Sequence, residues 1–359
     1  MEKLAGFRDA ALAKRVVEQI RKVAPSYPVK ICHVCGTHEW TISHYGLRAL
    51  LPESVDVIAG PGCPVCIIPA AEIDEAIKLA LEKNVTIATF GDLVRVPGSD
   101  MSLQDARARG GDVRIVYSVL DAVKMAEREP SRDFAFLAVG FETTAPSTAV
   151  EVLKKPPGNL SFLVSHRLIP PAMELLLGVG DLHIDGFIAP GHVSTIIGMK
   201  PYEVFPHAYH MPTVVAGFEP LDVLFTVSML LQQIKNSEAK LENEYSRVVS
   251  WDGNVKAQKL IGQAFNVVAG GWRGLGMVPA SALALKKEHS EYDTRSKYNV
   301  KVEQSRDLLP GCLCHLVMIG KIKPPECSLY MKACTPQTPK GACMVSIEGT
   351  CRIWAKHKA

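Results

Sequence analysis

Short apolar runs alternate with amphipathic segments over the first two thirds of the chain. The apolar runs at 29–34, 55–59, 85–90 and 112–116 have the length of buried strands. The segments at 8–23, 40–51 and 73–81 repeat apolar residues at three- and four-residue spacing, which predicts helices. Strands that alternate with helices favour a parallel sheet covered by helices, so the predicted fold class is α/β.

Part of this pattern occurs twice. Asp56 to Cys63 (DVIAGPGC) and Asp185 to His192 (DGFIAPGH) share the spacing of the aspartate, the Pro-Gly pair and a reactive side chain. The similarity predicts two similar parallel-sheet α/β domains, at 27–128 and 129–222, after an N-terminal helix within 1–26. Their strand-end loops would face each other across a ligand-binding cleft. Chance similarity between parallel-sheet segments is the alternative.

The pattern changes after residue 221. Helical spacing predicts helices at 221–234, 238–249 and 255–268, within a C-terminal domain at 223–359. From Cys312 onward the chain is rich in proline, glycine and cysteine and has little periodicity. Such a segment buries too little apolar surface to fold unaided, so we expect a metal or cluster to organise it.

Two cysteines lie three residues apart in Gly60-Pro-Gly-Cys-Pro-Val-Cys66, between a predicted strand and a predicted helix. We expect an irregular loop there, at the sheet edge where α/β proteins bind ligands. A helix N-terminus would also favour the thiolate form of Cys63 and Cys66. On this motif alone, a thioredoxin-like redox pair, half of a zinc site and a tight turn all stay open.

Charge and composition narrow the class of protein. The formal net charge is +3 without a long basic block, which argues against binding to nucleic acid or to an anionic membrane. Residues 1–9 lack the apolar core of a signal peptide, and the apolar run near 221–231 is too short to span a bilayer. We therefore expect a cytoplasmic protein.

The ten cysteines are clustered, with four between residues 32 and 66 and six after residue 311. In a reducing compartment, this favours metal binding or redox chemistry over structural disulfides. Cys35, Cys63 and Cys66, with His38, form a candidate site for a soft metal such as iron, copper(I) or zinc. Polar residues that could surround the site, or only stabilise loops, are Asp92, Arg95, Glu142 and His192.

The six C-terminal cysteines are Cys312, Cys314, Cys327, Cys334, Cys343 and Cys351. They contain no pair of C-x-x-C motifs, which zinc sites often use. Their irregular spacing favours an iron–sulfur cluster, since a cubane takes four thiolates from four directions. Zinc and free thiols remain alternatives on spacing alone.

Several motifs, in one order along nearly the whole chain, resemble those of the HypD family of [NiFe]-hydrogenase maturation proteins. They are CGTHE at 35–39, GPGCPVC at 60–66, TFGD at 89–92, RVPGS at 95–99, GFETTAP at 140–146, PPAM at 170–173, GHVS at 191–194, GFEPLD at 217–222 and WRGLG at 272–276.

The resemblance implies a scaffold on which the Fe(CN)2CO group of [NiFe]-hydrogenases is assembled, rather than a conventional turnover enzyme. It also implies two related α/β domains and a C-terminal domain with a [4Fe-4S] cluster. The implied partners are a HypC-type chaperone that shares the iron and a HypE-type protein that delivers cyanide.

The same resemblance implies roles for single residues. Cys35 would bind the iron with His38 close by, and Cys63 and Cys66 would be a redox-active pair. The implied cluster ligands are Cys312, Cys327, Cys334 and Cys351, with Cys314 and Cys343 as a disulfide relay. The chain departs from the family pattern around that relay, where Gly311 and His315 flank the C-x-C.

Two other classes of function remain open on the residues. One is a stand-alone disulfide reductase, in which an iron–sulfur cluster reduces Cys63–Cys66 for a partner protein. The other is a binding protein with a structural zinc. The scaffold requires Cys35 as an iron ligand, whereas a simple reductase does not.

Overall fold

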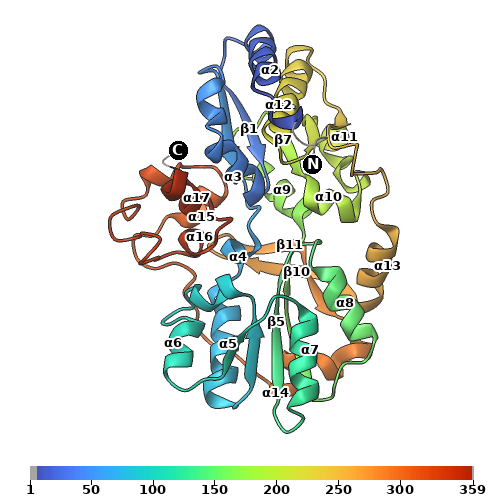
Figure 1. The fold of residues 1–359 in the computed structure, drawn as a ribbon, viewed down its shortest axis with the longest axis vertical. Helices are drawn as coiled ribbons and strands as arrows, with labels where there is room; N and C mark the ends of the chain where they lie inside the picture. The colour runs from blue at the N-terminus through green and yellow to red at the C-terminus, as the bar shows by residue number, and fades with distance from the viewer. Residues whose placement is uncertain (1–5, 358–359) are drawn as a thin grey trace.

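Parallel strands form two separate sheets in the computed structural model, which describes residues 6–357 (Figure 1). Sheet A has the strand order β2-β1-β7-β8-β9, and sheet B has the order β4-β3-β5-β6. All neighbouring strands in both sheets are parallel. The strands are β1 (Val29–His33), β2 (Val55–Ala59), β3 (Thr86–Thr89), β4 (Val113–Ile115), β5 (Phe134–Gly140), β6 (Leu160–His166), β7 (Gly186–Pro190), β8 (Thr213–Ala216) and β9 (Leu241–Asn243).

Helices connect the strands, as βαβ units require. The α-helices up to residue 264 are α2 (Ala10–Val23), α3 (Gly36–His44), α4 (Pro64–Ile67), α5 (Ala70–Glu82), α6 (Leu103–Ala108), α7 (Val119–Arg128), α8 (Ala145–Leu153), α9 (Ile169–Leu177), α10 (Gly191–Ile197), α11 (Val204–Tyr209), α12 (Pro220–Lys235) and α13 (Val255–Ala264). Short 3-10 turns are η1 (Gly6–Arg8), η2 (Leu47–Leu50), η3 (Gly91–Arg95) and η4 (Lys200–Tyr202). The predicted α/β class is confirmed, and the predicted N-terminal helix lies at Ala10–Val23, with residues 1–5 outside the described part of the chain.

Strand β1 places alternate side chains in different cores, as the period of a strand requires. Ile31 packs in the cluster that α2 and α12 cover, together with Ile20 and Leu224. Its neighbour Cys32 belongs to the cluster that contains Cys63, Cys66 and the C-terminal cysteines. One face of sheet A is thus an ordinary apolar core, and the other meets the cysteine-rich part of the chain.

The division at residue 128 does not coincide with the sheets. Strands β7 and β8 join β1 and β2 in sheet A, and strands β3 and β4 join β5 and β6 in sheet B. The chain leaves sheet A after β2, builds sheet B, and returns with β7. The two similar segments at 56–63 and 185–192 therefore begin at strands that flank β1 in one sheet, instead of marking two successive domains.

Three local expectations are wrong. The segment at 238–249 is not a helix, because residues 241–243 pair with β8 as an edge strand. The helix predicted to reach residue 268 ends at Ala264, and β10 (Phe265–Trp272) pairs with β11 (Gly276–Leu285) in an antiparallel hairpin between the two sheets (Figure 1). The segment at 60–66 is not wholly irregular, since it runs into the short helix α4.

The C-terminal region is helical and irregular, as expected. Its elements are η5 (Lys287–Tyr292), α14 (Thr294–Tyr298), α15 (Cys314–Met318), η6 (Pro324–Glu326), α16 (Ala342–Val345) and α17 (Thr350–His357). It follows sheet B at α14 and then packs α16 against α4 and α17 against α3 (Figure 1). Among residues 6–357, no helix is both long and apolar enough to cross a bilayer.

Candidate functional site

Thiols from distant parts of the chain line one small buried cavity, here called the cysteine cavity. Cys35 follows β1, Cys63 and Cys66 follow β2, and Cys343 comes from α16. The other lining residues are His33, Gly36, Gly60, Pro61, Gly62, Met318, Glu348 and Thr350. The structure thus brings together the three cysteines of the predicted soft-metal site and adds a fourth that was expected in the relay.

The loops after β1 and β2 touch at the level of the backbone. The Gly36 N–H donates to the Gly62 carbonyl at 3.3 Å. A side chain at Gly62 would place its first carbon 2.2 Å from the backbone nitrogen of Cys35, and one at Gly36 would lie 2.5 Å from the Glu348 carbonyl oxygen. Glycine is required at both positions because backbone lies where a Cβ atom would be.

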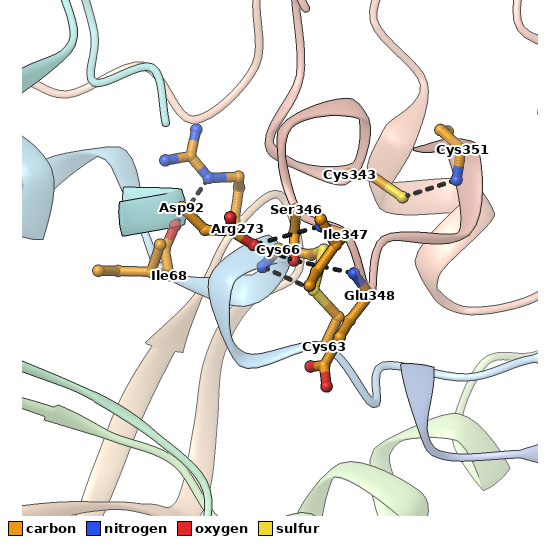
Figure 2. The surroundings of a disulfide bond; sticks show 10 residues. All are labelled: Cys63, Cys66, Ile68, Asp92, Arg273, Cys343, Ser346, Ile347, Glu348 and Cys351. Carbon is orange, nitrogen blue, oxygen red and sulfur yellow. Dashed lines mark hydrogen bonds between the residues drawn. A yellow bond between two sulfur atoms is a disulfide. The ribbon is translucent and has the colours of Figure 1, made fainter. Parts of the chain in front are cut away.

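Cys63 and Cys66 form a disulfide in the structure, with their Cα atoms 5.3 Å apart (Figure 2). Cys63 precedes α4, and its sulfur accepts the Cys66 N–H at 3.2 Å. Figure 2 shows the side chain of Glu348 next to this disulfide. The bond locks two of the cavity's sulfurs, so neither can bind a metal until the disulfide is reduced.

Cys35 is a protonated thiol at neutral pH. Burial raises its pKa to about 11, and the negative charge of Glu348 adds to this effect. The N–H groups of His38 and Thr37, at the start of α3, lower the pKa but do not outweigh burial. Metal binding at Cys35 must therefore release a proton.

A buried carboxylate holds the cavity wall and the C-terminal region together. Glu39 on α3 is fully buried and accepts hydrogen bonds from both Nη atoms of Arg48, at 2.9 and 2.7 Å. It also accepts from Ser43 at 2.7 Å, His33 Nε2 at 2.8 Å and Trp354 Nε1 at 2.8 Å. Burial alone would raise the pKa of Glu39, but Arg48 and His33 together lower it below its ordinary value.

His38 and His192 lie together at a different place on the same edge of sheet A. The His38 Nε2 is 2.9 Å from the Gly217 carbonyl, and its ring stacks on Phe218 at 4.8 Å between centroids. His192 stacks on the same phenylalanine at 3.9 Å. Neither histidine is among the residues that line the cysteine cavity.

Asp92, Arg95 and Glu142 also lie outside the cavity lining. Asp92 accepts from the Ser346 hydroxyl and the Ile347 N–H, both at 3.2 Å, and so anchors the segment before Glu348 (Figure 2). Arg95 donates to carbonyls at 336 and 337. Glu142 accepts the N–H at the start of α9, and burial raises its pKa to about 7. The first two stabilise the C-terminal region.

Four residues that line the cavity were not predicted from the sequence: His33, Met318, Glu348 and Thr350. His33 stands two residues before Cys35, and this spacing along a strand end is a usable indication. Glu348 and Met318 come from a region without periodicity. Nothing in the local sequence there shows which strand edge it will meet.

The six C-terminal cysteines are buried free thiols, and all of them except Cys327 belong to one core cluster. Burial raises the pKa of Cys334, and the charges of Cys312 and Cys327 add to the rise. A hydrogen bond with Cys343 and burial raise the pKa of Cys351, which also feels the charge of Cys334. Cys334 thus lies near the other three cysteines that the resemblance marks as cluster ligands, whereas hydrogen bonds join Cys312 to Cys314 and Cys351 to Cys343.

Four thiolates are the donor set that a [4Fe-4S] cluster takes. Within residues 6–357, no three Cys, His, Asp or Glu side chains converge on a point that one metal ion could occupy. Thiolates around a cubane lie farther apart, because each binds a different iron. The pairing of Cys314 with Cys343 stays a prediction, since both are free thiols here.

A buried cation adjoins these cysteines. Arg273, 1% exposed, donates to the Ile68 carbonyl at 2.7 Å (Figure 2). It also donates to the carbonyls of Asp307 and Pro97, both at 2.8 Å. A hydrogen bond with Cys314 lowers the pKa of Cys312 to about 7, and the charge of Arg273 contributes to that fall. A guanidinium at this place favours the anionic form of the thiols, which a cluster requires.

The fold and the site define an α/β protein that gathers thiols from its sheet edge and from a cysteine-rich C-terminal region. Residues 11–358 match the family model described as HypD, hydrogenase formation hypA family. A hydrogenase maturation factor HypD of Rhizobium leguminosarum bv. viciae is 44% identical over 99% of this chain and 95% of its own. Those of Cupriavidus necator and Escherichia coli are 43% and 42% identical, over 98% of this chain and 96–97% of theirs. The chain belongs to the HypD family of hydrogenase maturation factors.

Replacing Trp354 by Phe should lower the free energy of unfolding. The ring is kept, but Glu39 loses the indole N–H while it stays buried, and a hydrogen bond to a charged group contributes about 1.5–3 kcal/mol. Urea denaturation checks this, with Trp251→Phe as the control because Trp251 is 47% exposed. Equal unfolding midpoints for the two variants would contradict the role given to the buried carboxylate.

His166 should make stability fall in acid. It is 1% exposed, its Nε2 lies 3.0 Å from the Thr148 hydroxyl, and burial lowers its pKa to about 3. In the unfolded chain this histidine takes up a proton near its ordinary pKa of 6.5, whereas in the folded protein it stays neutral down to about pH 3. The stabilisation present above pH 6.5 is therefore lost as the pH falls toward 3, by about 1.4 kcal/mol per pH unit. Urea titrations between pH 7 and 5 should show a shallower pH slope for His166→Gln than for the wild type. The exposed His207→Gln should keep the wild-type slope, and an unchanged slope in His166→Gln would refute the assignment.

Proposed function

We propose that this chain is the scaffold on which the Fe(CN)2CO group of [NiFe]-hydrogenases is assembled, with the iron held at Cys35. The observation that supports this most directly is the placement of Cys35, Cys63 and Cys66 in one buried cavity. Thiolates suit iron. An iron that already carries three diatomic ligands needs few further ligands from the protein, and thiolates can later be displaced when the cargo leaves.

The disulfide requires a reduction step before its sulfurs can serve the iron. In the proposed step, the Cys343 thiolate attacks one sulfur of Cys63–Cys66, and Cys314 then attacks the mixed disulfide. Cys314–Cys343 forms, Cys63 and Cys66 become thiols, and two electrons and two protons are transferred in all. The presence of Cys343 in the cavity lining supports this route.

The proposed holders of the resident cofactor are Cys312, Cys327, Cys334 and Cys351. A [4Fe-4S] cluster bound there would supply electrons one at a time, taken from an external one-electron donor, to restore the Cys314 and Cys343 thiols. The buried guanidinium of Arg273 offsets negative charge in this region.

The cavity has a volume of about 10 Å³, room for about one water molecule, so it must widen before a cargo with cyanide and carbonyl ligands can enter. The N–H groups of Thr37 and His38 at the start of α3 favour a Cys35 thiolate once its proton has left. The segment that carries Glu348 packs on Gly36 at the cavity wall. The proposed partners, a HypC-type chaperone and a HypE-type cyanide-delivery protein, would need this segment to move in order to reach the iron.

Replacing Cys35 by Ala should abolish iron loading. Infrared spectra of anaerobically purified wild-type protein, produced with its chaperone, should contain cyanide and carbonyl stretching bands, and those bands should be absent from Cys35→Ala. Cys32→Ala is a matched control, because Cys32 is also fully buried but does not line the cavity. Bands that persist in Cys35→Ala would refute iron binding at this thiol.

The observed Cys63–Cys66 disulfide also fits a stand-alone disulfide reductase. In that case the wild type lacks the infrared bands, and Cys35→Ala reduces a disulfide of a partner as fast as the wild type does. The two functions thus differ in whether they require the Cys35 thiol.

Replacing Cys334 by Ala should remove the cluster. Cys334 lies among the other predicted ligands and accepts the Lys340 N–H at 3.3 Å, so its loss should lower bound iron and sulfide and destabilise the C-terminal region. Iron and sulfide are measured in anaerobic protein, with Cys32→Ala again as the control. Full iron and sulfide content in Cys334→Ala would remove it from the ligand set.

A further inference from the structure

We propose that His33 binds the iron cargo through its ring Nδ1 atom in the cysteine cavity, beside Cys35. The inference deepens the proposed function and rests on it, because it takes the iron as the ligand of this site. The observations that carry it are the burial of the ring, its bond to a carboxylate and its position in the cavity wall.

The bond to Glu39 fixes which ring nitrogen carries hydrogen. His33 is 1% exposed, and its Nε2 lies 2.8 Å from Glu39 Oε2. The two oxygens of Glu39 also accept from Arg48, Ser43 and Trp354, so this carboxylate acts only as an acceptor. The Nε2 atom therefore carries a hydrogen, and in the neutral ring Nδ1 presents a lone pair.

That lone pair has no hydrogen-bond partner among the described residues. His33 is nevertheless among the residues that line the same cavity as Cys35. Buried polar atoms are nearly always paired, so an orphan nitrogen at a cavity wall indicates a missing ligand. Metal-binding histidines almost always donate their other N–H to a carboxylate or carbonyl, which orients the ring and raises its basicity.

Two other buried histidines show what distinguishes His33. His38 and His166 also leave Nδ1 unpaired, but their Nε2 atoms bond to the Gly217 carbonyl and the Thr148 hydroxyl. Neither is bonded to a carboxylate, and neither lines the cysteine cavity. Only at His33, among these three, do the ion-paired nitrogen, the free lone pair and the cavity coincide.

The ligand count agrees with such a cargo. An iron with three diatomic ligands has at most three positions left. Cys35 and His33 offer one thiolate and one imidazole, and both ligand types suit iron.

The first experiment uses cobalt(II) alone as the probe, added to the reduced, anaerobic full chain with its cluster content measured. Proton NMR should show a strongly shifted, solvent-exchangeable resonance from the His33 Nε2–H, which Glu39 holds in place. The resonance should be lost in His33→Gln and in Cys35→Ser, and retained in His166→Gln. Absence of any shifted exchangeable resonance in the wild type overturns the proposal without relying on a variant. Its persistence in His33→Gln overturns it as well.

Affinity gives a second measure. Glu39→Gln replaces the carboxylate that orients the ring with a neutral amide. Loss of such a partner typically costs 10–100-fold in metal affinity, so cobalt(II) should bind about 10–100-fold more weakly. His33→Gln should lose at least as much, and His166→Gln should bind as the wild type does. Wild-type affinity in His33→Gln contradicts the proposal.

Infrared spectra separate this inference from the proposed function. If the wild type carries cyanide and carbonyl bands and His33→Gln either loses them or shifts them, both proposals are supported. If the bands are unchanged in His33→Gln, the histidine assignment fails while the scaffold function stands. If the wild type carries no bands, the scaffold function fails, and the cobalt experiment then decides whether His33 is a metal ligand.

Discussion

The close contact between two strand-end loops is the constraint on which the site depends. Strands β1 and β2 are parallel neighbours, so the chain leaves both at the same edge of sheet A. The glycines at 36 and 62 then let the two loops meet without intervening side chains. Cys35 and Cys63 consequently lie in one cavity because of backbone geometry, before any metal or partner acts on them.

The C-terminal region completes this arrangement by two contacts of different character. Glu348 lies on Gly36 by close packing, and Trp354 donates a hydrogen bond to the buried carboxylate of Glu39. Burying an ion is costly unless it is paired, and Glu39 receives donors from β1, α3, η2 and α17. The loop after β1 and the cysteine-rich region are therefore held in one position relative to each other, which places Cys343 in one cavity with Cys63 and Cys66.

The sequence could predict the elements and the thiols but not their grouping into sheets. Apolar periodicity locates β1, β2 and α5 to within a few residues, because buried strands and helices impose it directly. It contains no information on which strands pair, so the interleaving of β7 with β1 was missed. The hairpin of β10 and β11 was missed because its exposed apolar residues, such as Val267 and Val268, continue a helix-like spacing. His33 and Glu348 were missed because their role arises from long-range contacts.

The interleaved chain order has a consequence for the timing of folding. The Lys30 N–H at the start of β1 bonds to Asp185, which lies 155 residues later, and Glu39 bonds to Trp354, which lies 315 residues later. Contacts of such high sequence separation form late. A ribosome-bound chain can complete sheet B while sheet A still lacks β7 and the wall contributed by the C-terminal region. The cysteine cavity is therefore finished only when almost the whole chain has been made, so a truncated or half-folded molecule leaves Cys35 and Cys63 without the wall that encloses them.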